Sequence, residues 1–309
     1  MAAIELSGVT KRYGEVTAVR DLDLTVEDGE VYGFLGPNGA GKSTTINMLL
    51  DFVRPTAGEV RVLSMDAQAD STAVRRRTGV LPEGYDVYDR LTGRKHVEFA
   101  IDSKDADADP QAILERVGLP DAGDQKAGDY SKGMRQRLVL GMSLVGDPDL
   151  LVLDEPSTGL DPTGAREMRE IVRREADRGA TVFFSSHILG QVEEVCDRVG
   201  IMRDGELVAQ DSIEGLREAV GDGQRLVVTV DAASESQVAA VRSLDGVSGA
   251  ETDGGTVTVT CEPDAKSRIV ATLEDEGVTV KDFTTEEASL EDLFVHYTEE
   301  PVAADGGDR

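Results

Sequence analysis

A glycine-rich segment ending in a lysine is the part of this sequence whose residue types and spacing point most directly to chemistry. It is the run Gly36, Pro37, Asn38, Gly39, Ala40, Gly41, Lys42, Ser43 and Thr44. The run fits the pattern G-x-x-x-x-G-K-[ST], in which glycines let backbone amides converge on phosphate oxygens at a helix N-terminus. Lys42 would reach the β and γ phosphates of ATP, and the Ser43 hydroxyl would ligate Mg²⁺. An apolar run precedes the segment and a helical pattern follows it, which favours this interpretation over a glycine turn that only caps a helix.

Two carboxylates at the end of an apolar run form a second candidate site. Residues 150–153 are all Leu or Val, and Asp154 and Glu155 follow them. A buried parallel strand ends at the edge of the sheet where ligands bind. Asp154 therefore suits the metal shell of Mg-ATP, and Glu155 suits polarising an attacking water. A strand that runs into a charged turn is the alternative, and the phosphate loop favours the catalytic interpretation.

A third segment, 130–137, reads Tyr-Ser-Lys-Gly-Met-Arg-Gln-Arg and opens a helical pattern. The hydroxyl of Ser131 and the amide of Gly133 at a helix start can bind an anion. The segment has no nucleotide loop of its own, so a nucleotide would have to come from elsewhere. An ordinary serine cap on a basic helix stays open as the alternative.

The elements that must position these residues follow from apolar periodicity. Strands are expected at 4–9, 18–26, 31–35, 59–63, 79–81, 150–153, 181–185, 199–202 and 206–209, and helices at 42–52, 95–101, 110–117, 134–145, 163–178, 189–195 and 213–220. Repeated strand and helix predict a parallel sheet covered on both faces, and the early strands with short turns predict an antiparallel flank.

The pattern changes near 221–223, where Gly, Asp and Gly fall together. Strands at 227–230, 247–252, 256–260 and 278–283, with helices at 234–244, 265–276 and 290–297, predict a small ferredoxin-like split βαβ unit. The expected organisation is a nucleotide-binding domain at 1–220, an accessory α+β domain at 221–302 and a disordered tail at 303–309.

Charge excludes some classes of partner. The chain has 32 Lys and Arg against 60 Asp and Glu, a formal net charge of -28. Direct docking onto nucleic acid or an anionic membrane needs a basic face, so neither is expected. The excess of acids suggests a salt-rich cytoplasm, because at molar salt the Debye length falls to about 3 Å and self-repulsion is screened. Simple solubility is the alternative.

Cysteines and apolar stretches indicate the compartment. The two cysteines, Cys196 and Cys261, make no disulfide framework and are too few for a closed zinc site, so a reducing compartment is expected. The N-terminus does not read as a signal peptide, and no stretch approaches the ~18 apolar residues of a membrane span. If the protein acts at a membrane, another chain supplies the membrane part.

The order of these motifs resembles that of the ATP-binding cassette ATPases, the motor subunits of ABC transporters, over about residues 4–220. Segment 130–134 resembles their signature motif, usually Leu-Ser-Gly-Gly-Gln. Asp161 falls in a segment similar to their D-loop, His187 matches their switch histidine, and Tyr13 matches the aromatic residue that stacks on adenine. Read alone, Asp161 would serve as a helix N-cap, His187 as another cap, and Tyr13 as a strand-end aromatic. His96 and His296 lie in no motif and are given no role.

The resemblance implies a P-loop NTPase fold of ABC type, with an antiparallel β flank, an α-helical signature subdomain and the small C-terminal ferredoxin-like domain. Three residues of the signature and one of the Q-loop depart from the family pattern: Tyr130, Lys132, Met134 and Glu83. Glu83 stands where Gln is usual and can still bind water or Mg²⁺, so altered coupling is expected rather than a dead site. The signature sequence, and an ending at 289–294 similar to the accessory domain, resemble the branch that serves export permeases.

The resemblance also implies partners. One chain carries one phosphate loop and one signature, so two complete sites require a head-to-tail dimer in which Ser131 and Gly133 close over ATP held by Lys42 and Ser43 of the other copy. Glu155 would orient water and His187 would sense the γ phosphate. A separate membrane permease would dock near 79–101. The alternatives are a soluble ATP switch acting on translation or DNA repair machinery, and a module that binds ATP without hydrolysing it.

Overall fold

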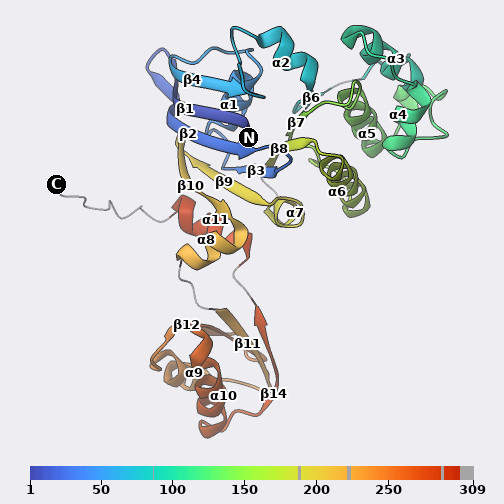
Figure 1. Ribbon diagram of the computed structural model, residues 1–309. Helices are drawn as coiled ribbons and strands as arrows, with labels where there is room; N and C mark the ends of the chain where they lie inside the picture. The colour runs from blue at the N-terminus through green and yellow to red at the C-terminus, as the bar shows by residue number, and fades with distance from the viewer. Residues whose placement is uncertain (86, 187–188, 221–223, 287–288, 300–309) are drawn as a thin grey trace. The chain divides into compact units, whose positions relative to one another are not determined.

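The structure is a computed structural model that describes residues 1–85, 87–186, 189–220, 224–286 and 289–299. The chain divides into two compact units, Met1–Ser212 and Ile213–Arg309, and each is described by itself (Figure 1). The predicted switch residue His187 and the predicted tail at 303–309 lie outside the described residues.

The N-terminal part of the first unit is an antiparallel sheet in the order β2-β1-β4-β5. Its strands are β1 (Ala2–Tyr13), β2 (Val16–Glu27), β4 (Ala57–Val62) and β5 (Met65–Asp66). From Leu22 to Glu27 of β2, buried and exposed residues alternate, because one face of the strand packs on the core. The sheet confirms the predicted antiparallel flank.

The second sheet of this unit has six strands in the order β10-β9-β3-β8-β7-β6. These are β3 (Val31–Leu35), β6 (Thr78–Leu81), β7 (Leu150–Asp154), β8 (Thr181–Ser186), β9 (Arg198–Arg203) and β10 (Glu206–Ser212). All neighbouring pairs are parallel except β10 with β9. Every residue of β3, β7 and β8 is buried, which explains the apolar runs at 150–153 and 182–184 and agrees with the predicted parallel sheet.

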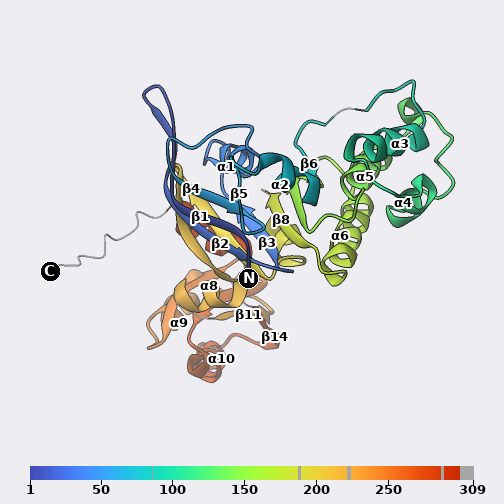
Figure 2. The same ribbon diagram turned by 45° about the horizontal axis from the view of Figure 1, so that its top comes forward.

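Helices connect these strands. They are α1 (Lys42–Leu49), α2 (Ser71–Arg77), α3 (Gly93–Lys104), α4 (Pro110–Arg116), α5 (Lys132–Ser143), α6 (Pro162–Asp177) and α7 (Leu189–Glu193), with a 3₁₀ turn η1 (Ala127–Asp129). Between β6 and β7, the helices α3, α4 and α5 pack on one another and lie together in both views (Figures 1 and 2). This group is the predicted helical subdomain.

An ion-pair network joins this helical subdomain to α6. Arg116 in α4 donates from Nε to Glu175 Oε1 at 2.8 Å and from Nη2 to Glu175 Oε2, while its Nη1 lies 2.6 Å from Asp147. The Glu175 side chain is buried and also receives Arg178 at 3.1 Å. Such a bidentate pair fixes the orientation of α4 on α6 as well as contributing energy.

The second unit contains α8 (Ile213–Val220), β11 (Gln224–Val230), α9 (Glu235–Arg242), β12 (Val247–Thr252), β13 (Thr256–Cys261), η2 (Pro263–Ala265), α10 (Lys266–Asp275), β14 (Val280–Glu286) and α11 (Leu290–Glu299). Its strands pair antiparallel in the order β12-β13-β11-β14, and Val228, Val238 and Ile269 bring the sheet, α9 and α10 into one core. This is the predicted ferredoxin-like arrangement. Helix α8 packs against α11 within this unit. The predicted domain boundary at 220 would leave α8 in the first domain, and it stays a prediction.

Local conformation accounts for the elements that differ from expectation. Helix α1 ends at Leu49 rather than at 52, and Asp51 takes a left-handed φ of 52°. Helix α2 and strand β5 were not predicted, because both are short and α2 buries only Val74. Periodicity gives little signal for an element with a single buried side chain.

Candidate nucleotide-binding site

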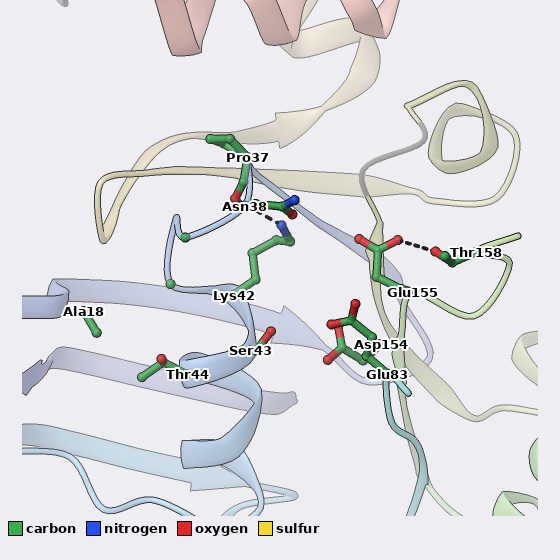
Figure 3. A pocket seen from close by; sticks show the side chains of 12 residues that line it. Ala18, Pro37, Asn38, Lys42, Ser43, Thr44, Glu83, Asp154, Glu155 and Thr158 are labelled. Atoms are coloured by element: carbon green, nitrogen blue, oxygen red, sulfur yellow. Dashed lines mark hydrogen bonds between the residues drawn. The ribbon is translucent and has the colours of Figure 1, made fainter. Parts of the chain in front are cut away.

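The carboxyl ends of β3, β6 and β7 open into one cavity of about 250 Å³ (Figure 3), here called the Lys42 pocket. This end of a parallel sheet is where ligands of such folds bind. It is lined by Ala18, Pro37, Asn38, Gly39, Gly41, Lys42, Ser43, Thr44, Glu83, Asp154, Glu155 and Thr158. The structure thus brings together the predicted phosphate loop, both predicted carboxylates and the Q-loop glutamate.

Glycines shape the loop between β3 and α1. A Cβ atom on Gly36 would lie 2.6 Å from the carbonyl oxygen of Met202, and one on Gly41 would lie 2.6 Å from that of Ala18. Gly41 also has a φ of 107°, which L side chains rarely adopt, and it supplies no side-chain cap to α1. The N–H groups of the first turn of α1 have no acceptor within the helix, so they can donate hydrogen bonds to phosphate oxygens.

Lys42 is hydrogen-bonded to its own loop. Its side chain is nearly buried, and Nζ donates to the carbonyl oxygens of Gly36 at 2.5 Å and of Pro37 at 3.4 Å. Burial lowers the pKa of Lys42, and the carboxylates of Glu155 and Asp154 act against that shift. A triphosphate that binds here would therefore replace the carbonyl contacts of Lys42 Nζ with charge-assisted hydrogen bonds to phosphate oxygens.

Asp154 is a buried carboxylate, only 8% exposed. It accepts a hydrogen bond from Ser185 Oγ at 2.5 Å. Burial raises its pKa, nearby Glu83 and Glu155 raise it further, and the Ser185 hydroxyl and Lys42 act in the opposite direction. A cation between these oxygens would stabilise the ionised carboxylate.

The residues present fit Mg²⁺ shared with a nucleotide. The Ser43 hydroxyl and the carboxylates of Glu83 and Asp154 face one pocket, and oxygen donors are what Mg²⁺ prefers (Figure 3). Within the described ranges, no three His, Cys, Asp or Glu side chains form a metal-holding cluster by themselves. Water and phosphate oxygens would have to complete the shell, which is common for this ion.

Glu155 is positioned by a sharp turn after β7. Its φ of 51° is left-handed, and its N–H donates to the carbonyl oxygen of Ser185 at 3.1 Å. Thr158 Oγ1 donates to Glu155 Oε2 at 3.1 Å (Figure 3). The carboxylate therefore lies in the pocket beside Asp154, in a place that suits a general base. Thr158 lies in no motif, and the sequence analysis missed it.

The signature residues lie elsewhere on the unit. Ser131 is the N-cap of α5 and accepts from the Met134 N–H at 3.2 Å. A second hollow, here called the Ser131 surface, is lined by Ser131, Lys132, Gly133, Arg137, Gly159, Leu160, Asp161, Thr163, Gly164 and Glu167. Neither Ser131 nor Gly133 is among the described residues that line the Lys42 pocket. Asp161 caps α6 by accepting from the Gly164 N–H at 2.7 Å.

Tyr13 ends β1 and is 48% exposed, with Lys11 Nζ 4.8 Å from its ring centroid. It is not among the described residues that line the cavity around Lys42. His96, which was given no role, has a structural one: its Nε2 accepts from the Tyr88 N–H at 2.9 Å, and its Nδ1 lies 2.9 Å from the carbonyl oxygen of Thr92.

The departures at the signature have structural partners. Tyr130 is buried, its hydroxyl donates to the carbonyl oxygen of Ala122 at 2.6 Å, and a Cβ on Gly93 would lie 2.2 Å from that hydroxyl. Lys132 covers Gly159, where a Cβ would lie 1.9 Å from its Nζ. The glycines at 93 and 159 therefore leave the space that the side chains of Tyr130 and Lys132 fill.

The fold and the site define a P-loop ATPase of the cassette type, and comparison with known proteins names the family. Residues 19–158 match the ABC transporter family, and residues 212–298 match the C-terminal domain of DrrA1-3-like ATP-binding proteins. The chain belongs to the ATP-binding subunits of ABC transporters.

Individual relatives agree with this assignment. The chain is 35% identical over 303 residues to the daunorubicin resistance ATP-binding protein DrrA3 of Streptomyces coeruleorubidus, covering 96% of each chain. It is 41% identical over 219 residues to the fluoroquinolones export ATP-binding protein MT2762 of Mycobacterium tuberculosis, covering 70% of this chain and 73% of that one. A dimeric post-hydrolysis structure of the cassette MJ0796 with ADP and Pi shares the fold, with a TM-score of 0.62 and 24% identity over 68% of this chain and 98% of that one.

Proposed function

We propose that the protein is the ATP-hydrolysing subunit of an ABC exporter and acts as a head-to-tail dimer. The observation that carries this proposal is that the Lys42 pocket and the Ser131 surface, both in the first unit, share no lining residue. One copy therefore offers a nucleotide site and, elsewhere, a serine cap for an anion. Two copies facing in opposite directions would complete two sites. The dimer in the MJ0796 structure is of a related fold.

In this proposal the chain's own residues bind and orient Mg-ATP. The amides of the loop and α1 hold the phosphates, Lys42 leaves its carbonyl partners for the β and γ phosphates, and Tyr13 stacks on adenine. Ser43, Asp154 and Glu83 would hold Mg²⁺, which would supply charge neutralisation for the transferred phosphoryl group.

Hydrolysis in this proposal uses the Glu155 carboxylate in the Lys42 pocket. Glu155, held by Thr158, orients a water toward the γ phosphate and accepts its proton. Ser131 and Gly133 of the second copy seal the γ phosphate, and His187 senses it. Loss of that phosphate removes the contacts that favour the closed dimer, which is how one ligand can move a two-state equilibrium.

We further propose that a separate membrane permease docks near 79–101. Two large apolar side chains are exposed there, Tyr88 at 70% and Phe99 at 61%. No helix in the described part of the chain is long and apolar enough to cross a membrane. The names of relatives that refer to drug export and drug resistance support an exporter over a switch in translation or DNA repair. The accessory domain at 221–302 is proposed to belong to this branch.

Two assays test the proposal. Phosphate release from ATP by the purified chain should require Mg²⁺ and stop with EDTA. Co-expression with a membrane protein, where one is encoded beside this chain, should yield a complex that survives detergent extraction. An active ATPase that never captures that chain, or any other membrane chain, would favour the soluble switch.

A salt-rich cytoplasm is part of the same proposal, because the net charge of -28 is large for 309 residues. Screening by molar salt removes most of the self-repulsion of such a chain. The melting temperature should rise from dilute to molar potassium chloride. An unchanged or lower value would leave solubility as the reason for the acidic surface.

A further inference from the structure

Gln136 connects the signature helix α5 to the loop that follows Glu155. Its side chain is 1% exposed, and Nε2 donates to the carbonyl oxygen of Pro156, the residue directly after Glu155. Its Oε1 is buried and has no hydrogen-bond partner in the described part of the chain. A buried amide with half of its polar capacity unused costs stability, so packing alone gives no reason for a glutamine here.

The same loop has one further bond to a neighbouring helix and one within itself. Ser157 Oγ donates to Gln191 Oε1 in α7, and Thr158 Oγ1 donates to Glu155 Oε2 at 3.1 Å. Thus the carboxylate of Glu155 belongs to a short loop that is bonded to α7 through the side chain of Ser157. Gln136 is the hydrogen-bonded attachment from α5.

Helix α5 begins at Ser131, which caps it and lines the Ser131 surface. Lys132, the next residue, covers Gly159 of the loop. The first two turns of α5 therefore contact the loop at Lys132 and at Gln136, and a displacement of Ser131 would be transmitted to both contacts.

We infer that Gln136 is a positioning residue: through its bond to Pro156, the position of α5 determines the position of Glu155 in the same chain. This inference rests on the proposed dimer, in which Ser131 of a chain touches the ATP of its partner while Glu155 acts on that chain's own ATP. The γ phosphate at one site then sets the geometry of hydrolysis at the other. The prediction is specific: Gln136 acts in the chain whose Glu155 does the chemistry.

Mixed dimers test this inference. A small amount of a chain with intact Glu155 is mixed with a large excess of Glu155→Gln chain, so that nearly every active chain pairs with an inactive one. In the first arm Gln136→Met is placed in the active chain, and in the second arm it is placed in the excess chain. Methionine keeps an unbranched side chain of similar length and removes the donor.

Phosphate release should fall roughly 10- to 100-fold in the first arm, because small misplacement of a catalytic group has effects of that size. It should stay within about 2-fold of the unsubstituted mixture in the second arm. A loss in the second arm alone would mean that Gln136 serves the signature, and equal losses in both would mean a general role in folding or closure. Either result, or no loss in either arm, would overturn the inference.

Two controls separate this result from failure of the proposed function. Ser143→Ala removes another buried side-chain donor of α5, to the carbonyl oxygen of Leu140 at 2.7 Å, away from the loop, and should leave both arms unchanged. Sedimentation of the Glu155→Gln chain with and without ATP is measured first. If ATP produces no dimer, the proposed function fails whatever Gln136 does, whereas a dimer with unchanged rates in the first arm overturns only the inference.

Discussion

The Lys42 pocket and the Ser131 surface belong to the same unit but are built in different ways. In the pocket, the charged side chains of Lys42 and Asp154 are buried and already have hydrogen-bond partners. On the surface, Ser131 is exposed at the start of a helix, and its hydroxyl accepts from Met134 of the same turn. The charged groups of the pocket are thus held in place by the chain itself, whereas the hydroxyl of Ser131 lies at the surface, where the proposed dimer would bring it a ligand.

The largest expected effect is on the pocket side. Glu155→Gln should lower ATP turnover roughly 10²- to 10⁴-fold, the usual contribution of a general base, and should leave ATP binding intact. ATP should then hold the chain as a dimer that is visible by sedimentation. Wild-type turnover by the variant at matched salt would remove Glu155 from its proposed role.

The next largest effect is expected on the Ser131 surface, where Ser131→Arg should weaken dimerisation. A bulky cation at the N-cap would block closure, so ATP-dependent dimerisation of a Glu155→Gln background should weaken by about 100-fold or more, on the scale of a lost buried contact. Binding of a fluorescent ATP analogue to the monomer should be unchanged, because Ser131 is not among the described lining residues of the Lys42 pocket. Dimerisation at full strength would contradict the assignment of the Ser131 surface.

A stability measurement tests how firmly the helical subdomain holds the Ser131 surface. Arg116→Met leaves the buried carboxylate of Glu175 with Arg178 alone and should lower the free energy of unfolding by about 3 kcal/mol, the low end for a broken buried pair. Arg166→Met, which breaks an exposed pair with Glu170 at 3.0 Å, should cost less than about 1 kcal/mol. Equal losses in urea unfolding would show that the Arg116 network is no stronger than a surface pair.

The smallest effect concerns the pH dependence of the empty pocket. Burial raises the pKa of Asp154 above its value in the unfolded chain, so ionisation of this carboxylate destabilises the folded state. The loss of stability begins as pH rises through the unfolded pKa and is complete above the folded pKa. Asp154→Asn should therefore raise the melting temperature in EDTA at pH 7, and the gain should vanish below the unfolded pKa of about 4. The exposed Asp149→Asn should give no such gain. A lower melting temperature for Asp154→Asn at pH 7 would show that the carboxylate is stabilised rather than strained.

The sequence predicted what short-range patterns encode. The phosphate loop is contiguous, and Asp154 ends a strand that is apolar throughout, so both could be read from neighbouring residues. The two sheets and the ferredoxin-like unit followed from periodicity in the same way. Helix α2 has almost no buried face and gave no signal.

Contacts between segments that are distant in sequence could not be predicted. Gln136 reads as one more polar residue of a basic helix, and only the fold places it against Pro156. The fit of Tyr130 to Gly93 is of the same kind, since neither residue implies the other in a single sequence. The roles of Tyr13 and His187 came from the family resemblance and stay predictions.

Lys42 bonds to the carbonyl oxygens of Gly36 and Pro37, so in the empty loop these oxygens compete with any anion for the ammonium group. An anion that binds the ammonium group competes with these carbonyl oxygens for its N–H donors, so the exchange disfavours weak anions. A triphosphate offers several oxygens at once to the lysine and the surrounding amides, whereas chloride offers a single centre. At a high concentration of simple salt, these internal bonds would keep Lys42 selective for a triphosphate under conditions in which an unbonded ammonium group would be saturated by the salt anion.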